Sequence, residues 1–133
     1  MNVQDYRQAG FNLSTQIEQA VIDRAEADIK QCYLQPLIGS AEVDLETGNF
    51  RDTLSNLAYL LILQRSIVGT RAGAKQKQTA QSAEVSRWDI VSQQATVCAE
   101  KLQICAESVG VDKPWRVCKD ICGIFYKTQI LGY

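Results

Sequence analysis

Residues 88–109 read WDIVSQQATVCAEKLQICAESV, and this stretch decides the fold. Its apolar positions recur at alternating intervals of three and four residues, which is the spacing of one face of an α-helix. Polar residues fill the opposite face, and Gly110 follows as a C-cap. The pattern predicts a helix over 84–109 with a heptad-like apolar seam. The seam consists of Trp88, Val91, Ala95, Cys98, Leu102, Cys105 and Val109.

A second helix is predicted over 51–68, and it is apolar on nearly every side. Because apolar residues cover nearly all of its sides, several neighbours or another subunit must cover it. We therefore expect it to be the central helix of the protein. Its apolar residues are Leu54, Leu57, Ala58, Leu60, Leu61, Ile62, Ile67 and Val68.

Two further helices are expected at the ends of the chain. Thr15 and Glu18 have the spacing of a capping box, so the first helix is predicted over 16–33. Within it, Arg24 and Asp28 are four residues apart and are placed to pair with each other. A last helix is predicted over 114–130, with a proline in its first turn.

Residues 69–83 break the periodicity, because they are small and polar without helical or strand spacing. We interpret them as a long loop between the second and third main helices. Loops of this length inside compact domains are uncommon and are usually functional or disordered. This one carries Arg71, Lys75 and Lys77.

The fold class follows from length and composition. The chain of 133 residues suits one domain, 1–133, and it contains only two prolines and eight glycines. That low content of helix breakers favours an all-α fold of about four helices packed as a small bundle. The longest apolar run, 57–63, is far shorter than the roughly 20 residues that span a bilayer, so we expect no membrane partner.

Charge is balanced overall but segregated along the chain. The net charge is -1, yet residues 1–52 sum to -5, residues 53–83 to +4 and the remainder to zero. The basic middle contains four cations and no acid. It is interpreted as a contact between neighbouring copies, as a contact with a phosphate backbone, or as a merely solvated segment.

The residue types present exclude much common enzymology. The chain has no histidine, which removes histidine-based nucleophile systems, histidine metal sites and histidine pH switches. Phosphate-binding glycine motifs and calcium-loop spacing do not occur either. We therefore expect a protein that is not an enzyme, with no catalytic residues and no cofactor.

The five cysteines are odd in number and lack a close CxxC pair, which suits neither a disulfide framework nor a zinc ribbon. Residues 1–7 also lack the pattern of a secretory signal, so we expect reduced thiols inside a cell. Cys118 and Cys122 are one helical turn apart and Cys98 and Cys105 two, so a four-thiolate metal site between helices is geometrically conceivable. Packing of small apolar thiols on the helix stripes is favoured over metal binding.

Two passages carry a family resemblance. The first is Ile22–Ile29, IDRAEADI, with Tyr33 and Leu37 after it, and the second is Leu54–Lys77. A long second helix, a glycine-containing basic segment that ends in residues 82–84, and a long third helix complete the layout. Over most of the chain this layout resembles tailed-phage head-to-tail connector proteins, also called adaptors or head completion proteins.

The resemblance implies that the protein has a structural function at the head-to-tail junction of the virion. It would be made in the host cytoplasm. Small helical subunits of this family form a ring beneath the portal, continue the DNA channel and present a surface to a tail or stopper protein. The expected partners of this protein are thus further copies of itself, the portal protein, a tail or stopper protein, and DNA that passes through without sequence-specific contacts. By position, 69–83 would contact neighbouring subunits or the lumen, and 127–133 would reach toward the portal. The candidate interaction residues are Arg65, Arg71, Lys75, Lys77, Ile130, Leu131 and Tyr133.

Two alternatives remain at this point. The first is a cytosolic helical binding module or small nucleic-acid-associated regulator that uses the basic residues of the middle segment. Its binding to phosphate would weaken steeply as salt rises, unlike assembly driven by apolar burial. The second alternative is a thiolate metal protein, which would contain bound zinc and lose its fold with a chelator.

Overall fold

The computed structural model describes residues 1–73, 78–120 and 123–125, and it describes their side chains outside residues 67–88. This part of the chain is mostly helical and contains no strand, which confirms the all-α class. None of the described helices combines the length and the apolar character that crossing a membrane requires. The elements are α1 (Val3–Gln8), α2 (Gln19–Ile29), a π-helical turn (Lys30–Leu34), α3 (Gln35–Ile38), α4 (Gly48–Gly73), α5 (Gln78–Ser108) and a 3-10 turn (Pro114–Arg116).

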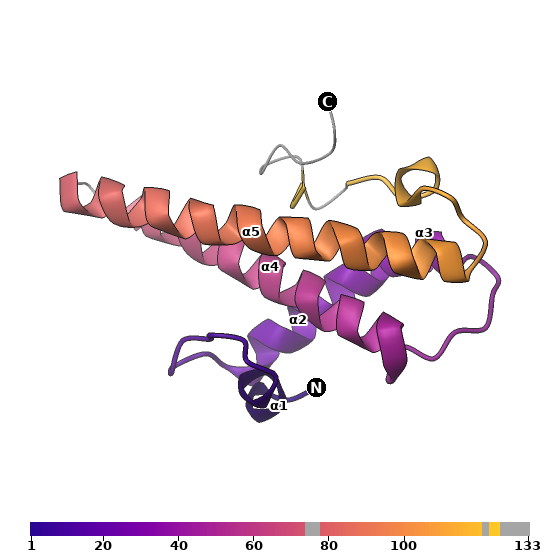
Figure 1. Ribbon diagram of the computed structural model, residues 1–133. Coiled ribbons are helices and arrows are strands. Elements are labelled where there is room, and N and C mark those ends of the chain that lie inside the picture. Colours follow the sequence, from indigo (N-terminus) through magenta and orange to yellow (C-terminus); the bar gives the residue numbers. More distant parts are fainter. Residues whose placement is uncertain (74–77, 121–122, 126–133) are drawn as a thin grey trace.

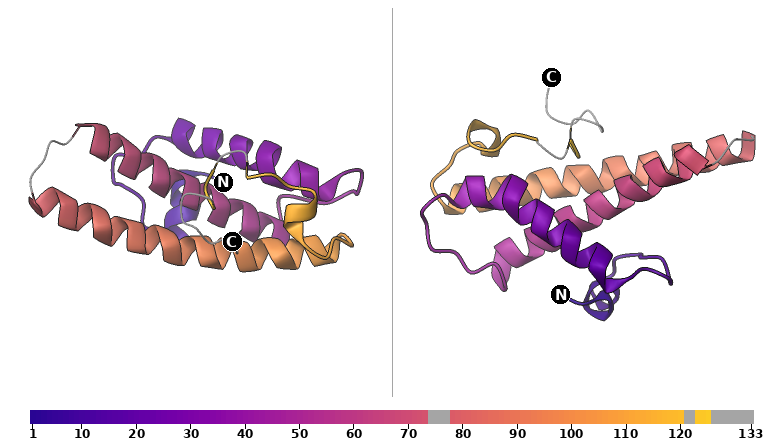
Figure 2. Two further views of the ribbon diagram at one scale, coloured as in Figure 1. Left: turned by 90° about the horizontal axis from the view of Figure 1, so that it is seen from above. Right: turned by 180° about the vertical axis from the view of Figure 1, so that it is seen from behind.

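The two long helices form an antiparallel hairpin, and the rest of the chain covers part of it. Helix α4 lies between α5 on one side and α2 on the other, with contacts to both (Figure 1). Helix α1 packs near the start of α2. At the end where α4 finishes and α5 begins, the hairpin extends beyond α1 and α2 (Figure 2). The body of the protein therefore sits on one half of the hairpin.

The predicted seam of α5 is confirmed over its described side chains, except that Val109 at its end is only partly buried. The seam packs against α4. Helix α4 is itself enclosed by its neighbours, as expected of a central helix. Fully burying one such aliphatic side chain stabilises the fold by about 1.5 to 3 kcal/mol. The fully buried residues of the two helices are Leu54, Leu57, Ala58, Leu60, Val91, Ala95, Cys98, Leu102, Cys105 and Ala106.

The predicted long loop over 69–83 is wrong for its described part. Helix α4 continues to Gly73, and α5 already begins at Gln78, so the predicted helix bounds of 68 and 84 are each several residues too short. The segment lacks proline and is rich in Ala, Gln, Lys and Arg, which are strong helix formers. Their propensity outweighs the two glycines at 69 and 73, each of which costs about 1 kcal/mol. Residues 74–77 lie outside the described residues.

The predicted helix over 114–130 is also wrong where it is described. Only Pro114–Arg116 form a helical turn, of the 3-10 type, and the backbone then leaves the helix. Asp120 accepts hydrogen bonds from the Tyr33 hydroxyl and from the Phe125 backbone N–H, and Gly123 has a φ of 71°. These contacts hold the segment in a non-helical path. The remainder of the predicted helix, 126–130, lies outside the described residues.

The first predicted helix, 16–33, begins later and ends differently. Helix α2 starts at Gln19 after an extended Glu18 that makes no side-chain cap, so the predicted capping box at Thr15 does not form. A capping box forms instead between Asn2 and Asp5, at the start of the unpredicted α1. After Ile29 the chain widens into a π-helical turn, because Pro36 has no N–H for the carbonyl four residues before it.

Leu102 and Ile104 provide a matched test of the seam, since they are two residues apart on α5 but 0% and 50% exposed. Leu102→Ala should lower the free energy of unfolding by about 2 to 5 kcal/mol, because it leaves a cavity in the helix contact. Ile104→Ala should change it by less than about 0.5 kcal/mol. Urea denaturation followed by circular dichroism measures both. Equal effects of the two variants would contradict the observed orientation of α5.

Candidate interaction surface

Arg65, one of the sequence-predicted interaction residues, lies on α4 and forms an ion pair with Asp28 of α2. The Arg65 Nη2 and Asp28 Oδ2 atoms are 2.6 Å apart, and the two side chains are 45% and 33% exposed. The expected Arg24–Asp28 pair is therefore wrong, because Asp28 pairs across the helix contact instead, and Arg24 is exposed. Arg65 thus ties α2 to α4, so its charge is only partly available to a partner.

The structure places the other predicted interaction residues only in part. Arg71 belongs to the final turns of α4, at the end of the hairpin that extends beyond the body. The remaining five lie outside the described residues. They are Lys75, Lys77, Ile130, Leu131 and Tyr133.

Helix α5 carries a second apolar stripe, which the sequence analysis missed. Ile90, Val97 and Ile104 are 50%, 39% and 50% exposed, although the buried seam runs along the same helix. They are seven residues apart, so they lie nearly above one another on the outer surface of α5. We call these three residues the outer stripe. The seven-residue interval was the signal that could have revealed it.

A groove on the described surface adjoins the outer stripe at Ile90. The groove consists of two hollows, and residues 12–14 line both of them. The first hollow, of about 410 Å³, lies between α2 and α4. The second, of about 380 Å³, lies between α4 and α5. The intervening loop is held by an Arg7 hydrogen bond to the Ser14 carbonyl and by the burial of Leu13. The apolar residues that line the two hollows are Leu13, Ile17, Val21, Tyr59, Ile62, Leu63 and Ile90.

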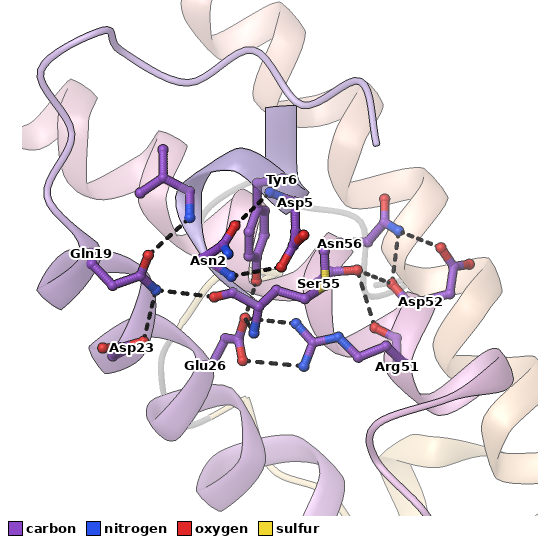
Figure 3. A network of polar contacts seen from close by, with 12 residues as sticks. Asn2, Asp5, Tyr6, Gln19, Asp23, Glu26, Arg51, Asp52, Ser55 and Asn56 are labelled. Carbon is purple, nitrogen blue, oxygen red and sulfur yellow. Dashed lines mark hydrogen bonds and ion pairs between the residues drawn. The ribbon is translucent and has the colours of Figure 1, made fainter. Parts of the chain in front are cut away.

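A buried ion pair fixes the elements around this surface (Figure 3). The Glu26 carboxylate of α2 receives two hydrogen bonds from the Arg51 guanidinium of α4, at 2.7 and 3.3 Å, and one from the Tyr6 hydroxyl of α1 at 2.6 Å. The Met1 amino group lies 3.6 Å from the same carboxylate. Burial opposes ionisation of Glu26, but the bonds from Arg51 and Tyr6 outweigh it and lower its pKa. Three helices thus meet at one carboxylate.

Three described cysteines are packed in the core. Burial raises the pKa of Cys98 to about 12 and that of Cys118 to about 11, and it also raises the pKa of Cys105. A raised pKa keeps a thiol protonated at neutral pH, and a protonated thiol is a poor nucleophile. Among the described residues, no group of three or more cysteines, aspartates or glutamates is placed to hold a metal ion. Cys122 lies outside the described residues.

Polar contacts also fix the register of the hairpin. Lys101 pairs with Asp52, and Gln94 donates to the side-chain oxygen of Asn56 at 3.0 Å. Thr53 and Cys105 are in hydrogen-bonding contact at 3.1 Å. These bonds follow one edge of the α4–α5 contact, next to the outer stripe. The outer stripe therefore lies on a part of α5 that is joined to α4 by specific polar bonds.

Comparison of the chain with protein-family models, with curated protein sequences and with solved structures finds no match.

Glu26→Gln should lower the free energy of unfolding at pH 7 by about 3 to 5 kcal/mol, because it leaves Arg51 buried without its counter-charge. The wild-type protein should lose this contribution as the pH falls below the ordinary glutamate value of 4.5, since the folded-state pKa is lower still. Urea titrations at several pH values measure both effects.

The exposed Glu42 supplies the control, since Glu42→Gln removes a carboxylate outside the network. It should leave the stability at pH 7 nearly unchanged. The Glu26→Gln protein should also show a shallower loss of stability in acid than the wild type. If Glu26→Gln and Glu42→Gln behaved alike, the ion pair would not hold the three helices together.

Proposed function

We propose that this protein is a non-enzymatic structural subunit of a phage head-to-tail connector ring, docked beneath the portal and continuing the DNA channel. The observation that supports this best is the α4–α5 hairpin. Its helices have 26 and 31 residues, which correspond to lengths of about 39 and 46 Å. One end of the hairpin extends beyond the body of the protein (Figure 2). A subunit of this shape can reach a neighbour or a channel while its body stays elsewhere in the ring.

The charge of the hairpin end supports the same function. Residues 53–83 contain four cations and no acid, and they run through the part of α4 that leads to this end. Arg65 is paired with Asp28, and the other three cations of the segment are Arg71, Lys75 and Lys77. A cationic end that meets passing DNA would contact phosphates, which requires no base recognition.

Three features support a structural rather than a catalytic function. The chain has no histidine, the described core thiols have raised pKa values, and Glu26, the one buried carboxylate among the described residues, forms a structural ion pair. Apolar side chains are instead exposed along α5, as expected of a surface that meets other proteins. The partners would be further copies of the chain, the portal, and a tail or stopper protein in the virion.

A helical nucleic-acid-binding module is the second candidate, and the acid-free stretch of four cations is the observation that favours it. Such a protein would bind DNA by itself, with an affinity that falls steeply as salt rises. The connector proposal expects weak binding to free DNA, because phosphate contacts would matter only inside an assembled channel.

The direct test is electron microscopy of the purified protein, alone and mixed with the portal protein encoded by the same genome. We expect a ring stacked on the portal. Arg71→Ser/Lys75→Ser/Lys77→Ser should leave the thermal unfolding of the isolated protein unchanged but reduce particle assembly or DNA delivery. Arg24→Ser, which removes an exposed cation from α2, is the control and should change neither.

The same samples separate the two candidates. Tight, salt-sensitive binding to a short DNA duplex without any ring on the portal would contradict the connector proposal and favour the binding module. Unchanged assembly and DNA delivery in the triple variant would show that the basic residues have no part in the function.

A further inference from the structure

The outer stripe has acidic residues along one side. Glu100 and Glu107 follow Val97 and Ile104 by three residues each, so each lies beside an apolar member of the stripe. Both glutamates are exposed, and neither has an ion-pair partner among the described residues. We call Glu100 and Glu107 the acidic edge. This face of α5 therefore combines exposed apolar area with unneutralised negative charge.

A complementary surface lies after the end of α5. Val117 is 45% exposed, and it is surrounded in sequence by three exposed cations. We call Lys113, Arg116, Val117 and Lys119 the basic patch. Arg116 pairs with Asp112, at 3.2 Å, and the two side chains are 66% and 68% exposed. Such an exposed pair contributes little and can be exchanged for another partner.

Buried neighbours of the basic patch anchor it to the body of the protein. Trp115 packs against Phe125 with ring centroids 5.0 Å apart, and Pro114 is buried. The Cys118 thiol donates a hydrogen bond to the Tyr33 carbonyl at 3.1 Å. The residues that alternate with the cations thus anchor the segment to the body, so the patch is presented on a fixed backbone.

The two surfaces account for nearly all the exposed apolar side chains of the described chain. Five large apolar residues are substantially exposed there, and four of them belong to the outer stripe or the basic patch. The fifth, Val21, lines the groove. Contact between the patch and the nearest turns of the stripe would cover Val97, Ile104 and Val117, and it would place two carboxylates next to three cations. Charge complementarity of this kind favours a specific pair of surfaces over random association.

From this we infer that the outer stripe and acidic edge of one copy dock on the basic patch of a second copy. An antiparallel contact between two outer stripes is disfavoured, because it brings the two acidic edges together. Since stripe and patch are different surfaces, the contact can repeat from copy to copy and close into a ring. This interface depends on one part of the proposed function, namely that copies of the chain assemble with one another.

Charge reversal tests the interface by sedimentation velocity over a range of protein concentrations. Wild-type protein should associate as concentration rises, and more weakly at high salt. Glu100→Lys/Glu107→Lys and Lys113→Glu/Lys119→Glu should each self-associate at least about tenfold more weakly, because like charges then face each other. An equimolar mixture of the two variants should associate again, since each copy then meets an opposite charge.

Circular dichroism of each variant establishes that it folds, and Glu18→Lys/Glu42→Lys, which reverses two exposed acids elsewhere, should associate like the wild type. A wild-type protein that stays monomeric at every concentration, or a mixture that fails to associate, would overturn the interface. If the mixture failed while wild-type rings still formed on the portal, only the interface would be wrong. If the mixture associated but nothing docked on the portal, the interface would stand and the connector function would be contradicted.

Discussion

The contact between α4 and α5 is the constraint on which the rest of the structure depends. Helix α4 is buried at every position from 53 to 61, so it cannot be exposed on any face there without losing the burial that stabilises it. Helix α5 covers one side with its seam, and α2 covers another with Ile22, Ala25 and Ile29. The remaining side is closed only partly by residues 12–14, which is why a groove with apolar walls remains there. The shape of the surface thus follows from how much chain is left to cover one central helix.

Apolar contacts alone do not fix how the covering elements are oriented, because they are not directional. The carboxylate of Glu26 supplies direction, since it accepts bonds from Tyr6 of α1 and Arg51 of α4 at the same time. A buried pair of this kind adds little net stability compared with apolar packing, but breaking it is costly. It therefore acts against alternative placements of α1 and α2 more than it adds to the overall stability.

The sequence predicted the parts of the fold that depend on local periodicity. The α5 seam was predictable because its intervals of three and four residues are unambiguous over six turns. The end of α4 was not, because residues 69–73 have no apolar pattern although their types form helices well. The segment after Pro114 was missed for a different reason. Its path is decided by Tyr33, whose bond to Asp120 joins residues 87 positions apart, and no local pattern reveals such a contact.

The candidate site was less predictable than the fold, because the charge of a residue can be read from the sequence whereas its exposure depends on tertiary packing. Residues at seven-residue intervals drift by about 20° per heptad around a straight helix, so Ile90 and Ile104 differ by about 40°. A second straight helix cannot follow such a stripe over its whole length without supercoiling. A short anchored segment such as that around Val117 does not need to follow it, because it contacts only one or two turns. The geometry of the stripe therefore agrees with the charges, and both favour the basic patch over another copy of α5.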